Sequence, residues 1–332
     1  MTSNHPLAVL AALALVVVVG VSGWSCSWAE APSHAAAQAE RFSVMTWNLD
    51  LYDLVASPVD PDAPPVAPPQ TDDIVAAVRS LSPDVIAFQG LGSPAAWTEL
   101  QFRLRDIKPE YRYNEYLATE GAPARHMGVL SRFPIVARVA LVQDRYTIGP
   151  TQFPVLRGFL QLDIEPNPDY RFRMLVAHFK SKRFHEYGQA EMRRNEARLL
   201  CNHIRASLSQ QPDINLIVMG DFNDEPGSRV LREVMTYQDQ PILYDLRPAD
   251  AQGDAWTRRS EADHHLRTSY MLVGRGMLPE VVLDATGILH TPLANSASPH
   301  RPLLATFSQI EKPAAETPDL SGRSAPEYAD YD

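Results

Sequence analysis

Cysteine is almost absent from this sequence of 332 residues, which contains only Cys26 and Cys201. Cys201 falls on an apolar helical stripe with Ile204 and Leu208, so we expect it to be buried in packing rather than reactive. If the chain is cleaved after Ala31, Cys201 is the single thiol that is left, and no internal disulfide can form. The sequence then excludes a fold held together by disulfides.

Positive charge is also scarce, because 30 Lys and Arg residues stand against 40 Asp and Glu residues, a formal net charge of −10. Residues 309–332 contain six acids and three prolines, and we expect them to form a disordered acidic tail. The rest of the chain is mildly acidic, which is a poor electrostatic match for DNA or RNA. Nucleic acid is therefore not an expected partner, whereas a small phosphorylated ligand is compatible with this charge.

No charged side chain precedes Glu30, and residues 7–21 form an apolar run rich in Ala, Leu and Val. The run is shorter than a full membrane span, so it predicts an export signal, with an uncleaved N-terminal anchor as the alternative. Cys26 leaves lipidation as a further alternative. We therefore expect a periplasmic or extracellular protein that touches a membrane only if residues 1–31 are retained, followed by a linker over 32–41.

The remaining composition is that of a globular domain, with 45% hydrophobic and 21% charged residues. Short apolar runs predict strands, and apolar residues at helical spacing predict helices. The predicted strands are 42–47, 85–88, 127–130, 159–164, 172–176, 216–219, 270–273 and 303–307; the predicted helices are 74–81, 97–104 and 187–208. A Pro-rich surface loop is expected over 57–69. We expect one α/β domain over 42–308, with stacked sheets flanked by helices.

Polar motifs follow or border most of the predicted strands. In chain order they are TWNLD (46–50), PDVIAFQG (83–90), GVLSRFPI (128–135), AHFKSK (177–182), RRNEARLL (193–200), VMGDFNDEP (218–226), TSYMLV (268–273) and SPHRPLLATF (298–307). Together these motifs resemble those of the endonuclease/exonuclease/phosphatase superfamily. The resemblance implies a four-layered α/β/β/α sandwich with two packed mixed β-sheets. It also implies hydrolysis of phosphate esters by water, assisted by a divalent cation, usually Mg²⁺.

The resemblance assigns roles to six residues of this chain. Asn48 matches a metal-binding Asn of the family, and Asp50 matches an acid found in some members, although it also suits a solvated loop. The catalytic candidates are His178, which matches a central His; Asp221, which matches the Asp that orients water; Asn223, which matches a phosphate-contacting Asn; and His300, which matches the terminal catalytic His. Carboxylates activate water and His side chains donate to phosphate oxygens in such sites. We expect Asn48 and the four catalytic candidates to converge on one cleft.

Three acids of the family pattern are missing from this chain. Gly90 replaces a metal-binding Glu, Ser269 replaces an Asp that pairs with the terminal His, and Pro299 replaces an Asp at the metal. Losing even an indirect partner of a metal costs about 10–100-fold in affinity or activity, and losing a direct carboxylate ligand should cost more. We therefore expect Mg²⁺ to bind weakly if it binds. Restoring the three acids is expected to cost little stability, because each position is predicted to face solvent at a strand end.

Three functions remain open. The first is a weakened or inactive phosphoesterase that still binds a phosphorylated ligand. The second is an active Mg²⁺-dependent phosphodiesterase, phosphatase or nuclease with a rearranged metal site, to which Asp263, His264 and His265 could contribute. The third is a non-catalytic binding module of the envelope.

Other charged residues near the motifs are expected on the surface. Lys180, Lys182 and Arg183 predict an exposed face, with a phosphate contact as the alternative. Glu196, in the long helix, is expected at the surface or in an ion pair.

Overall fold

The computed structural model describes residues 40–60, 62–119, 124–289 and 292–313, together with Met1 and Leu320. The expected leader, most of the linker 32–41 and most of the tail 309–332 lie outside the described residues, so they remain predictions from sequence. Within the described part of the chain, no helix is long and apolar enough to cross a membrane.

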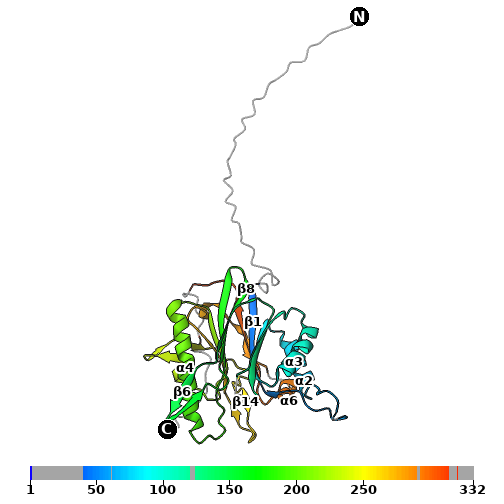
Figure 1. Cartoon of the computed structure of the whole chain (residues 1–332). Coiled ribbons are helices and arrows are strands. Elements are labelled where there is room, and N and C mark those ends of the chain that lie inside the picture. Colours follow the sequence, from blue (N-terminus) through cyan, green and yellow to red (C-terminus); the bar gives the residue numbers. More distant parts are fainter. Residues whose placement is uncertain (2–39, 61, 120–123, 290–291, 314–319, 321–332) are drawn as a thin grey trace.

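Two six-stranded mixed sheets form the centre of the molecule (Figure 1). The first sheet has the order β17 (Val281–Ile288), β18 (Leu303–Ser308), β1 (Arg41–Tyr52), β2 (Val85–Leu91), β4 (His126–Ser131) and β3 (Tyr113–Leu117). The second has the order β13 (Tyr244–Asp245), β16 (Ser269–Val273), β10 (Leu216–Asp221), β9 (Tyr170–His178), β8 (Phe159–Asn167) and β5 (Ile135–Leu141). Among the described strands each sheet has one parallel pair, β1 with β2 and β9 with β10. The carboxyl ends of these pairs carry or adjoin the candidate residues except His300, which precedes β18.

Apolar residues fill the space between the two sheets and also cover their outer faces. Successive side chains of a strand point to opposite faces, so Val44 faces the other sheet whereas Met45 faces outward. In the same way Met219 lies between the sheets and Val218 lies under the outer helices. Strands buried on both faces read as continuous apolar runs, which is why the central strands were predictable.

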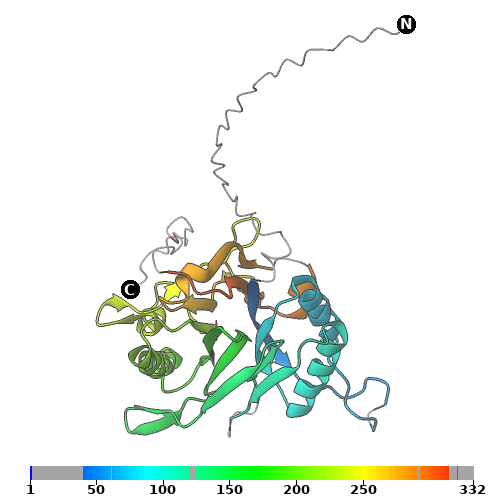
Figure 2. The same ribbon diagram turned by 90° about the horizontal axis from the view of Figure 1, so that it is seen from above.

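Helices cover both outer faces, as Figures 1 and 2 show. The first sheet is covered by α2 (Thr71–Leu81), α3 (Pro94–Ile107) and α6 (Pro292–Ala297), and the second by α4 (Gln189–Gln210) and α5 (Arg229–Met235). Ser93 and Ser228 cap α3 and α5, because their side chains accept the N–H of Ala96 and Leu231. The four-layered α/β/β/α sandwich implied by the resemblance is confirmed.

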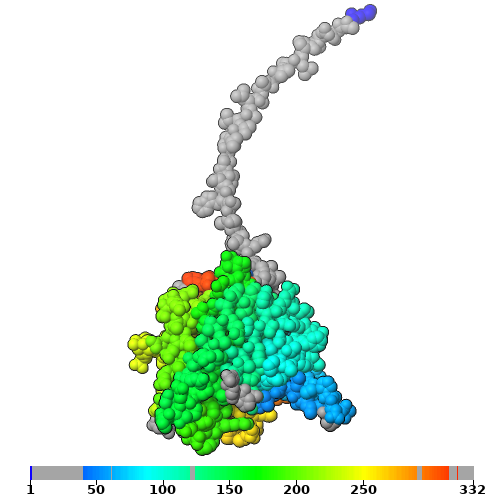
Figure 3. All heavy atoms as spheres, viewed as in Figure 1, coloured from blue at the N-terminus to red at the C-terminus, as the bar shows by residue number. Residues whose placement is uncertain are grey.

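Several shorter elements lie outside the two six-stranded sheets. They are the hairpins β6 (Arg145–Ile148) with β7 (Thr151–Pro154), β11 (Thr236–Tyr237) with β12 (Gln240–Pro241), and β14 (Arg258–Arg259) with β15 (His265–Leu266), and the 3₁₀ helix η1 (Leu278–Glu280). The Pro-rich loop is at the surface, as predicted, and its blue segment projects from one corner in Figure 3. Cys201 is buried, also as predicted.

Candidate active site

A cavity of about 370 Å³ opens where the parallel strand pairs of the two sheets end. All six residues predicted from the sequence line it. Its walls are formed by Asn48, Asp50, Arg125, Arg157, His178, Ser181, Lys182, Arg183, Asp221, Asn223, Arg258, Ser260, Glu261, Ala262 and His300. The structure therefore brings together residues from both ends of the sequence, as the order of the motifs predicts.

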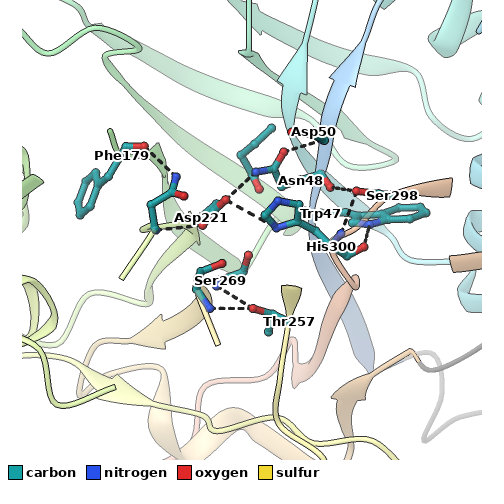
Figure 4. A network of polar contacts seen from close by, with 12 residues as sticks. Trp47, Asn48, Asp50, Phe179, Asp221, Thr257, Ser269, Ser298 and His300 are labelled. Atoms are coloured by element: carbon teal, nitrogen blue, oxygen red, sulfur yellow. Dashed lines mark hydrogen bonds and ion pairs between the residues drawn. The ribbon is translucent and has the colours of Figure 1, made fainter. Parts of the chain in front are cut away.

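Asp221 is the centre of a polar network that joins the two sheets (Figure 4). Its side chain, at the end of β10, is only 1% exposed. Asn48, on β1 of the other sheet, donates from Nδ2 to Asp221 Oδ2 at 2.6 Å, and His300 Nδ1 lies 3.7 Å from the same oxygen. The backbone N–H of Asn223 donates to the other carboxylate oxygen at 3.0 Å. Both oxygens of Asp221 are therefore engaged by protein groups.

His300 is held in place by the chain around it rather than by a strand. Ser298 donates from Oγ to the backbone oxygen of Asn48 at 2.7 Å and accepts the N–H of His300 at 3.1 Å. Trp47 donates from Nε1 to the His300 carbonyl at 2.8 Å. This turn is thus fastened to β1, which places the imidazole beside Asp221 (Figure 4).

His178 lies on the other side of Asp221, because the two residues are partners in the parallel register of β9 and β10. Asn223 donates from Nδ2 to the Phe179 carbonyl at 3.0 Å and adopts a φ of 53°, a region that Asn tolerates well. Arg157 donates to the carbonyls of His178 and Phe179 at 3.3 and 2.9 Å. The end of β9 is therefore fixed by side chains that also line the cavity.

Both histidines favour the neutral form. Burial lowers the pKa of His178 well below its usual value, and the nearby positive charge of Arg157 lowers it further. Burial also lowers the pKa of His300, although the carboxylate of Asp221 opposes this effect. Within the described residues neither Nδ1 atom has a hydrogen-bond partner. Each histidine therefore has a buried ring nitrogen whose hydrogen-bonding capacity no described residue satisfies.

Three arginines of the cavity were missed by the sequence reasoning: Arg125, Arg157 and Arg258. Arg125 donates from Nη1 to Asp50 Oδ1 at 2.7 Å and to the Asp50 carbonyl at 2.5 Å. Burial alone would raise the pKa of Asp50, but the hydrogen bond and charge of Arg125 bring it below its usual value. The available signal was position, because Arg125 and Arg157 each stand two residues before a predicted strand.

The positions of the missing acids do not all face solvent, so the expectation of an inexpensive repair was wrong. Gly90 is buried with φ +77°, and a Cβ there would lie 2.7 Å from Asn48 Oδ1 and 2.8 Å from the Asp50 carbonyl. Ser269 is also buried and donates its N–H to Thr257 Oγ1 at 3.0 Å. Pro299 alone is exposed. A larger side chain at Gly90 or Ser269 would therefore have to fit into buried surroundings.

Asp263, His264 and His265, the possible contributors to a rearranged metal site, do not line the cavity. The β14–β15 hairpin does form one wall of the cavity, but it does so through Arg258, Ser260, Glu261 and Ala262. His265 instead stacks on Trp256, with ring centroids 4.3 Å apart and an interplanar angle of 8°.

Glu196 is buried rather than at the surface, which corrects the expectation for this residue. Its carboxylate accepts the backbone N–H of Lys180 at 2.6 Å, and burial raises its pKa to about 7. Lys182 and Arg183 line the cavity wall just beyond, and Lys182 pairs with Glu225 at 2.6 Å. Glu196 thus anchors the segment that carries two cations to the cavity.

The cavity does not fit a magnesium ion. The described residues contain no group of three or more His, Cys, Asp and Glu side chains that could hold a metal. Asp221 accepts hydrogen bonds on both oxygens, and Asp50 is paired with Arg125. The Oδ1 atom of Asn48, the amide oxygen that a cation would need, accepts the Asp50 N–H at 2.8 Å.

The sequence pattern of the endonuclease/exonuclease/phosphatase family matches residues 45–276. This chain belongs to that family. A search of curated protein sequences finds no match. Members of the family generally depend on divalent metals, so the substituted acids set this chain apart.

Solved structures support the fold. The human Nocturnin catalytic domain, solved with a bound sulfate anion, is similar with a TM-score of 0.57 and 18% identity, over 82% of this chain and 95% of that one. Staphylococcus aureus beta toxin is similar with a TM-score of 0.58 and 12% identity, over 80% and 99%. An endonuclease/exonuclease/phosphatase from Beutenbergia cavernae has a TM-score of 0.55 and 19% identity, over 81% and 72%. At these identities the likeness concerns the fold alone.

Proposed function

We propose that this protein binds a small phosphorylated ligand in the family cleft and that its hydrolytic activity is weakened or lost. The observation that carries the proposal is the contrast within one cavity. Asn48, His178, Asp221, Asn223 and His300 converge there, whereas Gly90, Ser269 and Pro299 provide none of the family's remaining acids.

The charge of the cavity favours an anionic ligand. Five of its lining residues are Lys or Arg and three are acids, although the whole chain has a formal net charge of −10. Arginine presents several N–H donors in a fixed plane that matches phosphate oxygens. The sulfate bound to the human Nocturnin domain shows that a relative of this fold can hold a tetrahedral anion. A volume of about 370 Å³ suits a small ligand rather than a nucleic acid duplex.

The same geometry argues for weak hydrolysis. Asp221 is buried and each of its carboxylate oxygens already accepts one hydrogen bond, so fewer lone pairs remain to activate a water molecule. His300 lines the cavity, yet Asp221 is 3.7 Å from its Nδ1 and Ser269 offers no carboxylate. In a serine protease, replacing the carboxylate that orients the catalytic histidine lowers kcat by about 10⁴-fold. We therefore propose binding rather than rapid turnover.

The test combines binding and turnover on the purified protein. We expect phenyl phosphate to bind, and a chromogenic phosphodiester to be hydrolysed slowly, with little change on adding Mg²⁺ or on Asp221→Asn. The matched control is Asp72→Asn, because Asp72 is exposed and is not part of the cavity lining. Fast Mg²⁺-dependent hydrolysis that Asp221→Asn abolishes would establish the rearranged metal site instead. No binding of phenyl phosphate would support the non-catalytic scaffold.

We also propose that the protein is exported. The apolar run over residues 7–21 and the lack of charge before Glu30 support this proposal. The measurement is cell fractionation of the tagged full chain, with N-terminal sequencing of the product. Recovery of the intact chain in the cytoplasm would contradict export, and an intact chain in the membrane fraction would support the uncleaved anchor.

A further inference from the structure

The guanidinium of Arg125 and the Cβ position of Gly90 share one neighbour, the carbonyl oxygen of Asp50. Gly90 replaces the metal-binding Glu of the family pattern, and a Cβ on Gly90 would lie 2.8 Å from the Asp50 carbonyl oxygen. Arg125 Nη1 donates to this same oxygen at 2.5 Å. A fixed positive charge therefore stands directly beside the place from which a metal-binding side chain would have projected.

Arg125 is held there by a specific arrangement rather than by chance proximity. Its Nη1 also donates to Asp50 Oδ1 at 2.7 Å, and Asp50 adopts a φ of 60°. The N–H of Asp50 is in turn fixed by Asn48 Oδ1 at 2.8 Å. Asn48 thus uses its oxygen to shape the turn that positions the arginine, and its nitrogen to bind Asp221.

Two further arginines complete a cationic lining. The Arg157 side chain is buried behind the end of β9, and Arg258 projects from the β14–β15 hairpin, whose backbone bridges to His300. The Nε atoms of both arginines are buried and have no hydrogen-bond partner among the described residues. Buried donors without partners are costly, so they indicate groups that a bound ligand or water satisfies.

Three more of the buried polar atoms without partners belong to residues at or next to this site, although such atoms also occur elsewhere in the described chain, as at Trp97 and Asn215. The three are Nδ1 of His178, Nδ1 of His300 and Oγ of Ser269, none of which has a partner in the described structure. The two histidines favour the neutral form, so the charge of the lining comes from its five Lys and Arg residues and its three acids, which leaves an excess of positive charge. This combination suits an anion with several acceptor oxygens and does not suit a second cation.

We infer that Arg125 takes the place of the family's metal, so that the cavity binds a doubly charged phosphate group without a divalent cation. The inference rests on the proposed function, since it concerns the same cavity and the same class of ligand. It goes further in assigning the ligand's charge partner to Arg125, with Arg157 and Arg258 as additional donors. Asp221 and Asn48 then act as positioning residues, because they hold this arrangement through hydrogen bonds.

The experiment is a calorimetric titration of the full chain with inorganic phosphate, once in EDTA and once in Mg²⁺. The test variant is Arg125→Met, which keeps length and removes charge; Arg125→Lys keeps charge and loses the planar donors. Arg138→Met is the matched control, because Arg138 forms an exposed ion pair with Glu115 outside the cavity lining. Should Arg125→Met fail to fold, Arg258→Met tests the same lining from the hairpin.

We expect phosphate to bind equally in EDTA and in Mg²⁺, within about twofold. Arg125→Met should weaken binding by about 10- to 100-fold, as for the loss of a hydrogen bond to a charged group, whereas Arg138→Met leaves it unchanged. Sulfate should compete with phosphate and nitrate should not. Binding that requires Mg²⁺, or equal affinity in the two methionine variants, would overturn this inference and leave the proposed function standing. Absence of binding in both buffers would overturn the proposed function as well.

Discussion

Gly90 shows how the surroundings of a single residue oppose the restoration of a metal-binding acid. Its φ of +77° favours glycine, and a Cβ there would meet Asn48 Oδ1 and two backbone atoms of Asp50 at less than 3.0 Å. The sequence revealed the substitution but not its environment, because burial and φ are set by strand pairing between β1 and β2. An acid at this position is therefore opposed by the backbone itself.

We predict that Gly90→Ala destabilises the protein more than Gly227→Ala. Gly227 has a φ of +81° but nothing within 4 Å of its Cβ position, so it controls for backbone strain alone. Gly227→Ala should lower the free energy of unfolding by about 1 kcal/mol. Gly90→Ala should lower it by roughly a further 1–3 kcal/mol, because the added methyl group overpacks the site. Urea unfolding of both variants measures this difference, and equal losses would show that the close contacts relax freely.

At the scale of elements, α4 supports the cavity through a buried carboxylate that the sequence could not reveal. Helical spacing predicted α4 to within two residues at each end, but a charged residue in a helix is usually exposed. Glu196 is buried because the segment after β9 folds over it and presents the N–H of Lys180. Such a partner comes from tertiary structure and leaves no local signal.

We predict a pH dependence of stability that Glu196→Gln removes. Burial raises the pKa of Glu196 to about 7 from an ordinary value of 4.5, so the folded state favours the protonated acid. Its contribution to stability is fully present below pH 4.5 and is lost as the pH rises through 7. Glu196→Gln keeps an acceptor for Lys180, so its unfolding free energy should fall less between pH 5 and pH 8. Chemical unfolding across this range measures the difference, with Glu191→Gln as control because that side chain is 43% exposed. Parallel curves for Glu196→Gln and the unsubstituted protein would contradict the assignment.

The β14–β15 hairpin depends on a buried ion pair behind it. Arg301 donates to Asp250 at 2.5 Å, both side chains are 1% exposed, and the guanidinium lies 3.9 Å from the ring of Trp256. Asp250→Ala leaves Arg301 as an unpaired buried charge and should lower the free energy of unfolding by about 3–5 kcal/mol. Asp72→Ala, which removes the partner of Arg103 at an 83% exposed carboxylate, should cost less than about 1 kcal/mol. Thermal unfolding compares the two, and a small loss for Asp250→Ala would show that water replaces the pair.

At the scale of the whole molecule, the central strands could be predicted because they are buried on both faces, whereas the four-layered sandwich was implied by the resemblance of the motifs to the family. The order of the motifs also predicted the convergence of Asn48, His178, Asp221, Asn223 and His300, since each precedes or follows a strand of known direction in the family. Arg125, Arg157 and Arg258 escaped prediction because isolated arginines beside strands are commonly exposed. Their meeting in one cavity is a property of the assembled sheets and hairpin.

In the proposed cleft, arginine replaces the divalent cation of the family. Electron paramagnetic resonance of Mn²⁺ can test this replacement, because the signal of free Mn²⁺ falls as the ion binds protein. We predict no stoichiometric binding below millimolar Mn²⁺, with and without phosphate, and no change on Asp221→Ala. One Mn²⁺ bound per chain at micromolar concentration, and lost in Asp221→Ala, would contradict the account.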